Sequence, residues 1–264
     1  KIYNNSMKNT LFFFILFILF HNTSYSTNPD SGLIAFYPFN GNTNDESGKG
    51  NHGFNNGATL TSDRFGRTNN AYNFNHTYIE IPNSISLQSP SNSMTLAFWI
   101  NISQWDNNTA GIMAKSNSGA VGQYGSLIST TPYIQFDIGG QFARITRYFG
   151  LNTWYFVCLK WSGQKAILYL NGDAYDSAFF SGTMASDNNP LILGKHTPGS
   201  VSYLLGKLDD IRIYNRAISS AEIQQLYLET ILDLKVIPQG FYNPVTGRLR
   251  MKDTVKVLLR QTFS

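Results

Sequence analysis

The sequence predicts an all-β protein: a two-sheet antiparallel β-sandwich of the jelly-roll type with one short C-terminal helix, followed by a truncated β segment. Three observations predict this class. Apolar and polar residues alternate with a period of two in many short segments, Gly and Asn residues separate these segments, and only one segment has a helical period. Many short strands joined by such turns are typical of sandwiches and jelly rolls.

Two long segments show the alternation most clearly. In the segment 94–102 every second residue is apolar, so these side chains share one face of a strand. The segment 154–161 also places apolar residues on one face. Shorter apolar runs, each long enough for one strand, occur at Leu33–Phe39, Tyr78–Ile81, Ile134–Ile138, Ala166–Leu170, Leu191–Leu193 and Leu208–Tyr214.

Local signals mark one turn and the helix. Asn171-Gly172 separates two strand-like runs and predicts a two-residue hairpin, because both residues adopt positive φ readily. Ser219 and Glu222 have the spacing of a capping box, in which each side chain bonds to the backbone N–H of the other. Apolar residues then recur on one helical face, which predicts a helix that ends near Glu229.

The chain divides into three regions. Residues 1–26 hold upstream residues and a signal peptide, because the apolar run Leu11–Phe20 precedes small residues and a cleavage site after Ser26. This leader predicts a secreted or cell-surface protein. Residues 27–229 form the sandwich domain. Residues 230–264 hold too few strand-like runs for a core, which predicts the start of a truncated second β-module or a linker.

The distribution of charge and the number of cysteines exclude some classes of function. The whole chain has a net charge of +4, but the region 27–229 carries 12 Lys and Arg against 14 Asp and Glu. A nucleic-acid-binding surface needs clustered basic residues, so this class is excluded for the domain. The single cysteine, Cys158, excludes an intrachain disulfide, and its apolar neighbours predict a buried side chain.

Five motifs in order along the chain resemble one family. They are Gly32–Asn42, Thr95–Ile100, Thr153-Trp154-Tyr155, Leu168–Gly172 and Gly206–Ser219. Together they resemble the bacterial laminin-G-like (LamG) jelly rolls of the concanavalin A-like lectin/glucanase superfamily, over about residues 31–228. The resemblance implies the fold more strongly than the function, because lectins, adhesion modules, hydrolases and spacers share this fold.

The carboxylates do not predict an enzyme. Retaining glycosidases need two carboxyl groups about 5–5.5 Å apart, which one strand supplies at nearby positions on one face. The glutamates are Glu46, Glu80, Glu222 and Glu229, and none has a partner at such a spacing. The sequence also lacks a nucleophile elbow and a phosphate-binding loop. We therefore expect a protein that is not an enzyme.

The resemblance implies a candidate calcium site, because some members of the family hold Ca²⁺. Pairing of the first and last strands would bring Asn40 and Asp45 close to Asp209 and Asp210. Carboxylate and amide oxygens are the ligands that Ca²⁺ prefers. The alternative is that Asp45 caps its own turn, while Asp209 or Asp210 bonds to Arg212 or to a backbone N–H.

Aromatic residues in polar loops are the candidate carbohydrate-binding residues. An aromatic ring covers the C–H face of a sugar, and neighbouring amides and carboxylates bind its hydroxyl groups. The candidates are Trp105, Asn107, Tyr124, Asp187 and Tyr203. Trp105 is the strongest because its neighbours are polar, and Tyr124 is expected in a Gly-rich loop over 117–125. The alternative for each aromatic residue is partial packing against the core.

Two functions are compatible with these patterns. The first is a non-catalytic carbohydrate- or glycoprotein-binding module of a secreted or cell-surface bacterial protein, which predicts an exposed Trp105 beside a groove. The second is a structural or adhesive spacer in a large multidomain extracellular protein, which predicts aromatic residues packed inward. The expected partners are glycans or glycoproteins, without nucleic acid and without membrane insertion after removal of the leader, and the domain is expected to be part of a longer chain.

Overall fold

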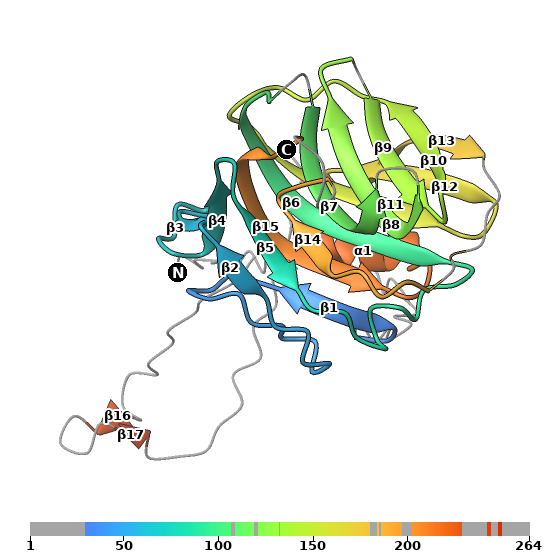
Figure 1. The fold of residues 1–264 in the computed structure, drawn as a ribbon. Coiled ribbons are helices and arrows are strands. Elements are labelled where there is room, and N and C mark those ends of the chain that lie inside the picture. The colour runs from blue at the N-terminus through green and yellow to red at the C-terminus, as the bar shows by residue number, and fades with distance from the viewer. Residues whose placement is uncertain are drawn as a thin grey trace, which may run out of the picture.

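The computed structural model describes residues 30–106, 109–118, 121–131, 133–179, 184, 186–196, 202–228, 242–243 and 248–249. Its body consists of two antiparallel sheets packed face to face, with one helix outside them (Figure 1). This architecture confirms the predicted all-β sandwich. No helix among the described residues is long and apolar enough to cross a membrane.

The first sheet has eight strands. They are β1 (Leu33–Tyr37), β3 (Thr59–Thr61), β4 (Ala71–Phe74), β6 (Met94–Gln104), β11 (Trp154–Trp161), β12 (Lys165–Leu170), β13 (Asp173–Phe179) and β15 (Leu205–Tyr214). Their order is β13-β12-β11-β6-β15-β4-β3, and β1 also pairs with β15. The first and last strands of the sandwich are therefore neighbours, as the family resemblance implies.

The second sheet has seven strands. They are β2 (Phe54–Asn56), β5 (Tyr78–Ile81), β7 (Thr109–Ser118), β8 (Val121–Ser129), β9 (Tyr133–Ile138), β10 (Gln141–Thr146) and β14 (Leu191–Leu193). Their order is β10-β9-β8-β7-β14-β5-β2. Neighbouring strands along this order pair antiparallel.

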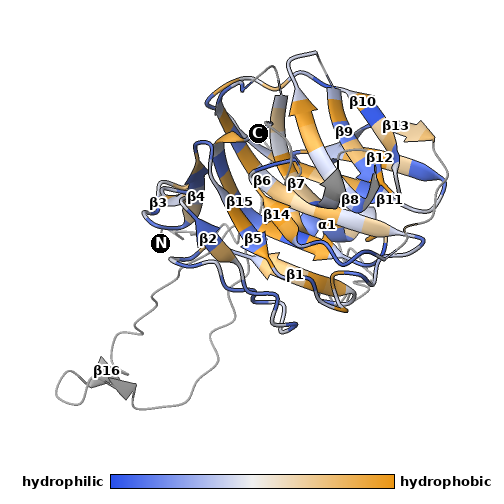
Figure 2. Ribbon diagram, viewed as in Figure 1, coloured by the Kyte–Doolittle hydropathy of each residue, from blue (hydrophilic) through white to orange (hydrophobic). Residues whose placement is uncertain are grey.

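The main hydrophobic core lies between the sheets. Leu96, Phe98 and Ile100 of β6 are fully buried in it, as the alternation in the sequence predicts. Trp161 and Phe136 contribute two of the largest buried side chains. Figure 2 shows that hydrophobic residues gather in the central strands, whereas the connecting loops are mostly hydrophilic.

Helix α1 (Ser220–Leu228) covers the outer face of the eight-stranded sheet. Ile223 and Leu226 belong to a second buried cluster that includes Phe156 and Cys158 of β11. Because Phe156 and Cys158 alternate with residues of the main core, they point to the opposite face of the sheet. Burial raises the pKa of the Cys158 thiol well above its ordinary value, so this cysteine is a core residue, as its sequence context predicts.

The predicted capping box is present at the start of α1. The Glu222 backbone nitrogen donates to Ser219 Oγ at 3.2 Å, and the Ser219 nitrogen donates to Glu222 Oε2 at 2.7 Å. Arg216 binds the same carboxylate through both terminal nitrogens. The predicted hairpin at Asn171-Gly172 is also confirmed, with positive φ at both residues between β12 and β13.

The expected Gly-rich loop over 117–125 is wrong. Residues 121–125 lie in β8, which pairs with β7 and β9. A Cβ at Gly125 would lie 3.0 Å from the backbone oxygen of Met113, so this glycine reflects close backbone packing within the sheet. In the sequence, a glycine that packs closely within a sheet cannot be distinguished from a glycine in a loop, so the sequence predicts a loop here.

Only four residues of the region 230–264 are described. They form β16 (Tyr242–Asn243) and β17 (Arg248–Leu249), which pair antiparallel. The leader and the strands expected at 231–237 and 254–259 lie outside the described residues. The second β-module therefore stays a prediction.

Candidate functional site

The outer face of the seven-stranded sheet carries the candidate site. In β5, Ile79 and Ile81 are buried in the main core, so the alternate residues Tyr78 and Glu80 lie on the outer face. Ile192 of β14 lies directly opposite Glu80 in the strand register. This part of the face is hollowed into a pocket of about 90 Å³ that is lined by Tyr78, Glu80, Pro190, Ile192 and Lys195.

Two tyrosine rings lie beside Lys195 at this pocket. Lys195 forms an isolated β-bridge with Tyr203, and its Nζ lies 4.8 Å from the Tyr203 ring centroid. The same Nζ lies 5.8 Å from the ring centroid of Tyr78. His76 packs its ring edgewise against Tyr203, with the centroids 5.4 Å apart. Tyr203 does not line the hollow itself but lies beside it, against Lys195. We call Tyr78, Glu80, Lys195 and Tyr203 together the tyrosine pocket.

A glycine allows the segment that carries Lys195 to lie directly on the sheet. A Cβ at Gly111 of β7 would clash with the backbone of His196 and Ser202, so a larger residue does not fit there. His196 reaches across to β9, where its Nε2 lies 2.7 Å from Asp137 Oδ2. These contacts hold Lys195 over the outer face of the sheet.

The tyrosine pocket combines three kinds of recognition group. Tyr78 and Tyr203 provide aromatic rings, which pack against apolar C–H surfaces. The Glu80 carboxylate accepts hydrogen bonds. Lys195 is only 8% exposed, and it holds a positive charge beside both rings. Such a set suits a ligand that has apolar faces and many hydroxyl groups at its edges.

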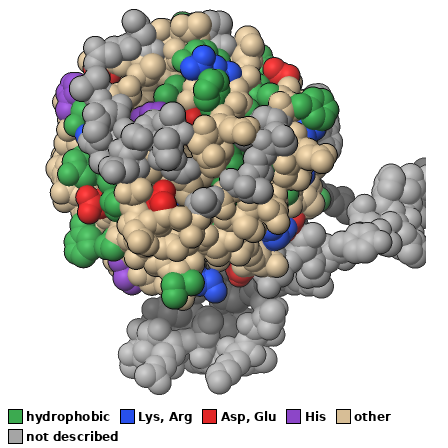
Figure 3. Space-filling model, turned by 45° about the vertical axis from the view of Figure 1, so that its right-hand side comes forward, with side chains coloured by type: hydrophobic (Ala, Val, Ile, Leu, Met, Phe, Trp, Pro, Cys, Tyr) green, Lys and Arg blue, Asp and Glu red, His purple; other side chains and the backbone are tan. Residues whose placement is uncertain are grey.

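One face of the molecule can be inspected for a charged patch (Figure 3). In the space-filling view of Figure 3, the described Lys, Arg, Asp and Glu side chains lie scattered among uncharged groups, without a continuous basic area on the face shown. A polyanion that binds through many phosphates needs such an area. The described residues on the face shown in Figure 3 therefore offer no surface of this kind.

Tyr203 is the predicted sugar-binding residue that the structure places beside the pocket, through its contact with Lys195. Trp105 is half-buried and packs against the main core, so the expectation of an exposed ring beside a groove is wrong. The polar residues next to Trp105 in the sequence predict an exposed ring. The core residues that cover it come from strands distant in sequence, which no local pattern reveals. Asn107 lies outside the described residues.

The Tyr124 ring is buried and is not available to stack on a sugar. It is 1% exposed, and its hydroxyl donates to the Leu87 backbone oxygen at 3.2 Å. Burial raises the pKa of this hydroxyl, and the nearby Asp187 carboxylate adds to the effect. The expectation of a sugar-facing Tyr124 is therefore wrong, because its strand turns the ring into the core.

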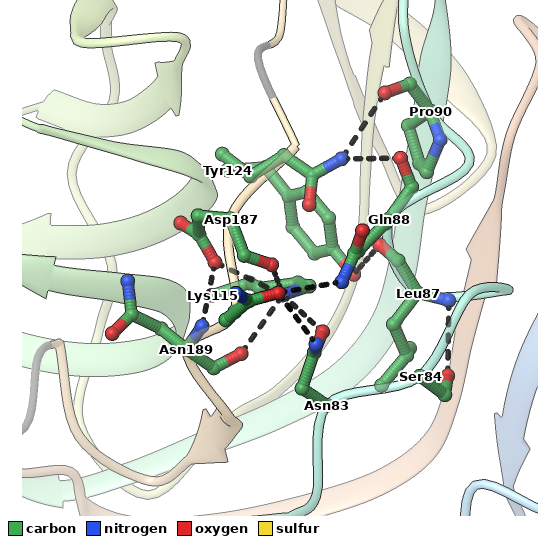
Figure 4. A network of polar contacts seen from close by, with 11 residues as sticks. Asn83, Ser84, Leu87, Gln88, Pro90, Lys115, Tyr124, Asp187 and Asn189 are labelled. Atoms are coloured by element: carbon green, nitrogen blue, oxygen red, sulfur yellow. Dashed lines mark hydrogen bonds and ion pairs between the residues drawn. The ribbon is translucent and has the colours of Figure 1, made fainter.

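Asp187 takes part in a buried network around Lys115, as Figure 4 shows. Lys115 Nζ donates to Asn83 Oδ1 at 2.9 Å and to Asn189 O at 2.8 Å. It also donates to the backbone oxygen and to Oδ1 of Asp187, both at 3.0 Å. Burial lowers the pKa of Lys115, while the bond to Asp187 opposes this change. In this network Asp187 holds loops together.

Asp45 caps its own turn, which is the alternative to calcium binding predicted from the sequence. Its Oδ1 accepts the backbone N–H groups of Phe36 and Ser47, both at 2.9 Å. Its Oδ2 accepts the Ser47 hydroxyl and the Asn51 N–H, both also at 2.9 Å. Asn40 is exposed in the same loop. The Asp45 carboxylate is therefore used to fix its own loop.

Asp209 and Asp210 bind an arginine. Arg64 Nη1 lies 2.7 Å from Asp209 Oδ2 and 2.8 Å from Asp210 Oδ2, and Arg64 also stacks on Trp99. Burial and the Asp210 carboxylate raise the pKa of Asp209 more strongly than Arg64 lowers it. No cluster of three or more His, Cys, Asp or Glu suited to a metal occurs among the described residues. Calcium binding stays a prediction.

Comparison with protein families defines the class of this protein. The family model of the concanavalin A-like lectin/glucanases superfamily matches residues 73–224. The chain therefore belongs to this superfamily. No curated protein matches the sequence significantly.

Solved structures with the same fold include binding domains of toxins and one domain of an extracellular arabinanase. The receptor binding domain of the botulinum neurotoxin C/D mosaic serotype is 17% identical with a TM-score of 0.61, and the match covers 77% of this chain and 52% of that one. Domain 4 of a GH43 extracellular arabinanase from Geobacillus stearothermophilus, in complex with arabinotriose, is 16% identical with a TM-score of 0.59. That match covers 74% of this chain and 98% of the arabinanase domain.

A third similar structure is that of botulinum neurotoxin type C, whose cell entry depends on interaction with two ganglioside molecules. It is 15% identical with a TM-score of 0.60, and the match covers 76% of this chain and 51% of that one. The chain thus spans about half the length of the toxin domains that it matches. At these identities the likeness shows the shared fold alone.

Sequence reasoning missed most of the tyrosine pocket. Tyr78 and Glu80 could have been found, because they alternate with Ile79 and Ile81 and so lie on the face away from the core. No sequence pattern near Lys195 predicts its position at the site, because that position depends on a β-bridge to Tyr203 and on packing over another strand. The Pro190 contribution depends equally on long-range packing.

Proposed function

We propose that this domain binds carbohydrate through the tyrosine pocket, as a non-catalytic module of a secreted or cell-surface protein. The observation that carries the proposal is the pocket itself. It places the Tyr78 ring, the Glu80 carboxylate and Lys195 together on the outer face of one sheet, and the Tyr203 ring lies beside it against Lys195. Rings for C–H faces and charged groups for hydroxyls are the usual means of binding sugars.

Two of the similar structures support a glycan as the ligand class. The arabinanase domain is seen with arabinotriose, and the type C toxin interacts with gangliosides. Export by the N-terminal leader is part of the same proposal, because extracellular glycans are the ligands available to such a domain.

The test is a glycan array probed with the full chain and with a Tyr203→Ala variant. Removing this ring takes away one of the two aromatic rings beside Lys195, so glycan binding should fall about tenfold or more, as expected for loss of a stacking partner. The matched control is Tyr148→Ala, because Tyr148 is 62% exposed and does not line the pocket. The proposal fails if the two variants bind every glycan equally well.

A second candidate function is a structural spacer. The inward packing of Trp105 and Tyr124 favours it, since a spacer needs no exposed aromatic residues. If the wild-type chain binds none of the glycans on the array, the spacer becomes the better interpretation.

A further inference from the structure

A second cluster of side chains lies at the other end of the same outer face, on the β9–β10 hairpin. Ala143 and Ile145 of β10 are buried in the main core, so Phe142 and Arg144 point outward. In β9, Tyr133 lies on the outer face for the same reason, because Ile134 and Phe136 are buried in the core. We call Tyr133, Phe142 and Arg144 the arginine clamp.

Arg144 lies between two aromatic rings. Its guanidinium carbon is 4.6 Å from the ring centroid of Tyr133 and 4.6 Å from that of Phe142. Cation–π contacts of this kind restrict the side chain and leave the planar edge of the guanidinium group open. Phe142 is 51% exposed, so the clamp is an outer surface of the protein.

A chain of polar contacts orients the guanidinium group further. Arg144 Nε donates to Gln135 Oε1 at 2.8 Å, and Gln135 Nε2 donates to Asp137 Oδ1 at 2.6 Å. Asp137 is in turn held by His196, next to Lys195 of the tyrosine pocket. This chain uses Nε of Arg144 and leaves both terminal nitrogens for a ligand. Among the described residues, none forms an ion pair with Arg144.

An oriented guanidinium group with two open terminal nitrogens matches one kind of ligand group. Two parallel N–H groups pair with the two oxygens of a carboxylate, and such charge-assisted pairs are stronger than neutral hydrogen bonds. Because the aromatic rings and Gln135 already hold Arg144 in place, little side-chain freedom is lost on binding. A lysine at this position would lack both the planar fork and the stacking.

We propose that the arginine clamp binds the carboxylate of an acidic sugar, so that the domain recognises carboxylated glycans. This inference rests on the proposed glycan-binding function, and it names the ligand class. The strand register places Glu80, Ile192, Ala114, Gly125 and Asp137 in one row across the face. The row ends at Asp137 of β9, and Arg144 lies one strand further, on β10. The clamp and the tyrosine pocket are therefore about five strand spacings apart, roughly 24 Å. One oligosaccharide of several units spans this distance.

The experiment uses the full chain and an array of sialylated and uronic-acid glycans, each paired with its carboxyl-reduced form. The wild type should bind the acidic form about tenfold more tightly than the reduced form, the scale of one charge-assisted bidentate pair. Arg144→Lys, which keeps the charge and loses the fork, should reduce this preference severalfold, and Arg144→Gln, which loses both, should bring the two forms to the same affinity. The matched control is Arg147→Lys, because Arg147 lies near the rings of Phe149, Tyr155 and Tyr175 rather than in the clamp.

The outcomes separate the two proposals. If the wild type shows no preference for the acidic form, or if Arg144→Lys keeps the full preference, the clamp assignment is overturned. Neutral glycan binding that depends on Tyr203 would then still support the proposed function. If the acidic preference depends on Arg144 but Tyr203→Ala changes nothing, the clamp stands and the tyrosine pocket is wrong. Unchanged thermal unfolding of each variant confirms that the fold is intact.

Discussion

At the scale of single residues, Lys115 organises one end of the sandwich. Its ammonium group is fully buried and donates to four oxygens that come from Asn83, Asp187 and Asn189. The residues around 83 and 187–189 are far apart in sequence, so one cation joins two separate loops. A buried charge of this kind is tolerated only when it is fully hydrogen-bonded.

Replacing this lysine should destabilise the fold. Lys115→Met removes the donor and leaves the buried oxygens without a partner, so the free energy of unfolding should fall by about 3 kcal/mol. Urea unfolding measures this change. Lys49→Met, at an exposed turn position, is the control and should change stability by less than about 0.5 kcal/mol. Equal stability of the two variants would show that the network contributes little.

Trp105 leads to a second prediction at this scale. Because its ring packs against the main core, Trp105→Ala should lower the free energy of unfolding by about 2–3 kcal/mol, somewhat less than for a fully buried tryptophan. Glycan binding should remain, since the ring is not part of the tyrosine pocket. Phe179→Ala, at a residue 80% exposed, is the control for the loss of an aromatic ring. A loss of binding without a loss of stability would restore Trp105 as a ligand contact.

At the scale of elements, helix α1 is joined to the sandwich by both apolar and ionic contacts. Its apolar residues pack on β11, and Trp99 stacks on Tyr227 with the ring centroids 5.8 Å apart. At its start, Glu222 binds Arg216 and the Ser219 N–H. The hydrogen bond from Arg216 lowers the pKa of Glu222 from 4.5 to about 2, and the bonds from Ser219 add to the effect.

The depressed pKa of Glu222 predicts how stability depends on pH. A carboxyl group with a lowered pKa in the folded state stabilises the fold above its unfolded pKa, and this contribution is lost as the pH falls toward about 2. Glu222→Gln should therefore cost about 2 kcal/mol at pH 6 and almost nothing near pH 2. Thermal unfolding from pH 6 to pH 2 measures the difference, with the exposed Glu46→Gln as control. A difference that does not depend on pH would contradict the assignment.

At the scale of the whole molecule, local patterns predicted strands such as β6 and β11, the Asn171-Gly172 hairpin and the helix cap, because each depends on residues close together in sequence. They did not predict β7, β8 or β10. The site depends on contacts between distant segments. Tyr203 was found only as an aromatic residue in a polar context, whereas Lys195 reaches it through a bridge that no local pattern marks. Arg144 alternates visibly with core residues, but its contact with Tyr133 requires the β9–β10 pairing.

The pairing of β1 with β15 determines how this domain must fold. Leu33 lies opposite Tyr214, so the strand that is made first gains its partner only when almost the whole domain has been synthesised. Contacts between residues so distant in sequence slow folding, because the chain must lose the entropy of closing a long loop before the contacts form. The domain is therefore expected to fold late and as one unit, after the last strand of the sandwich is available.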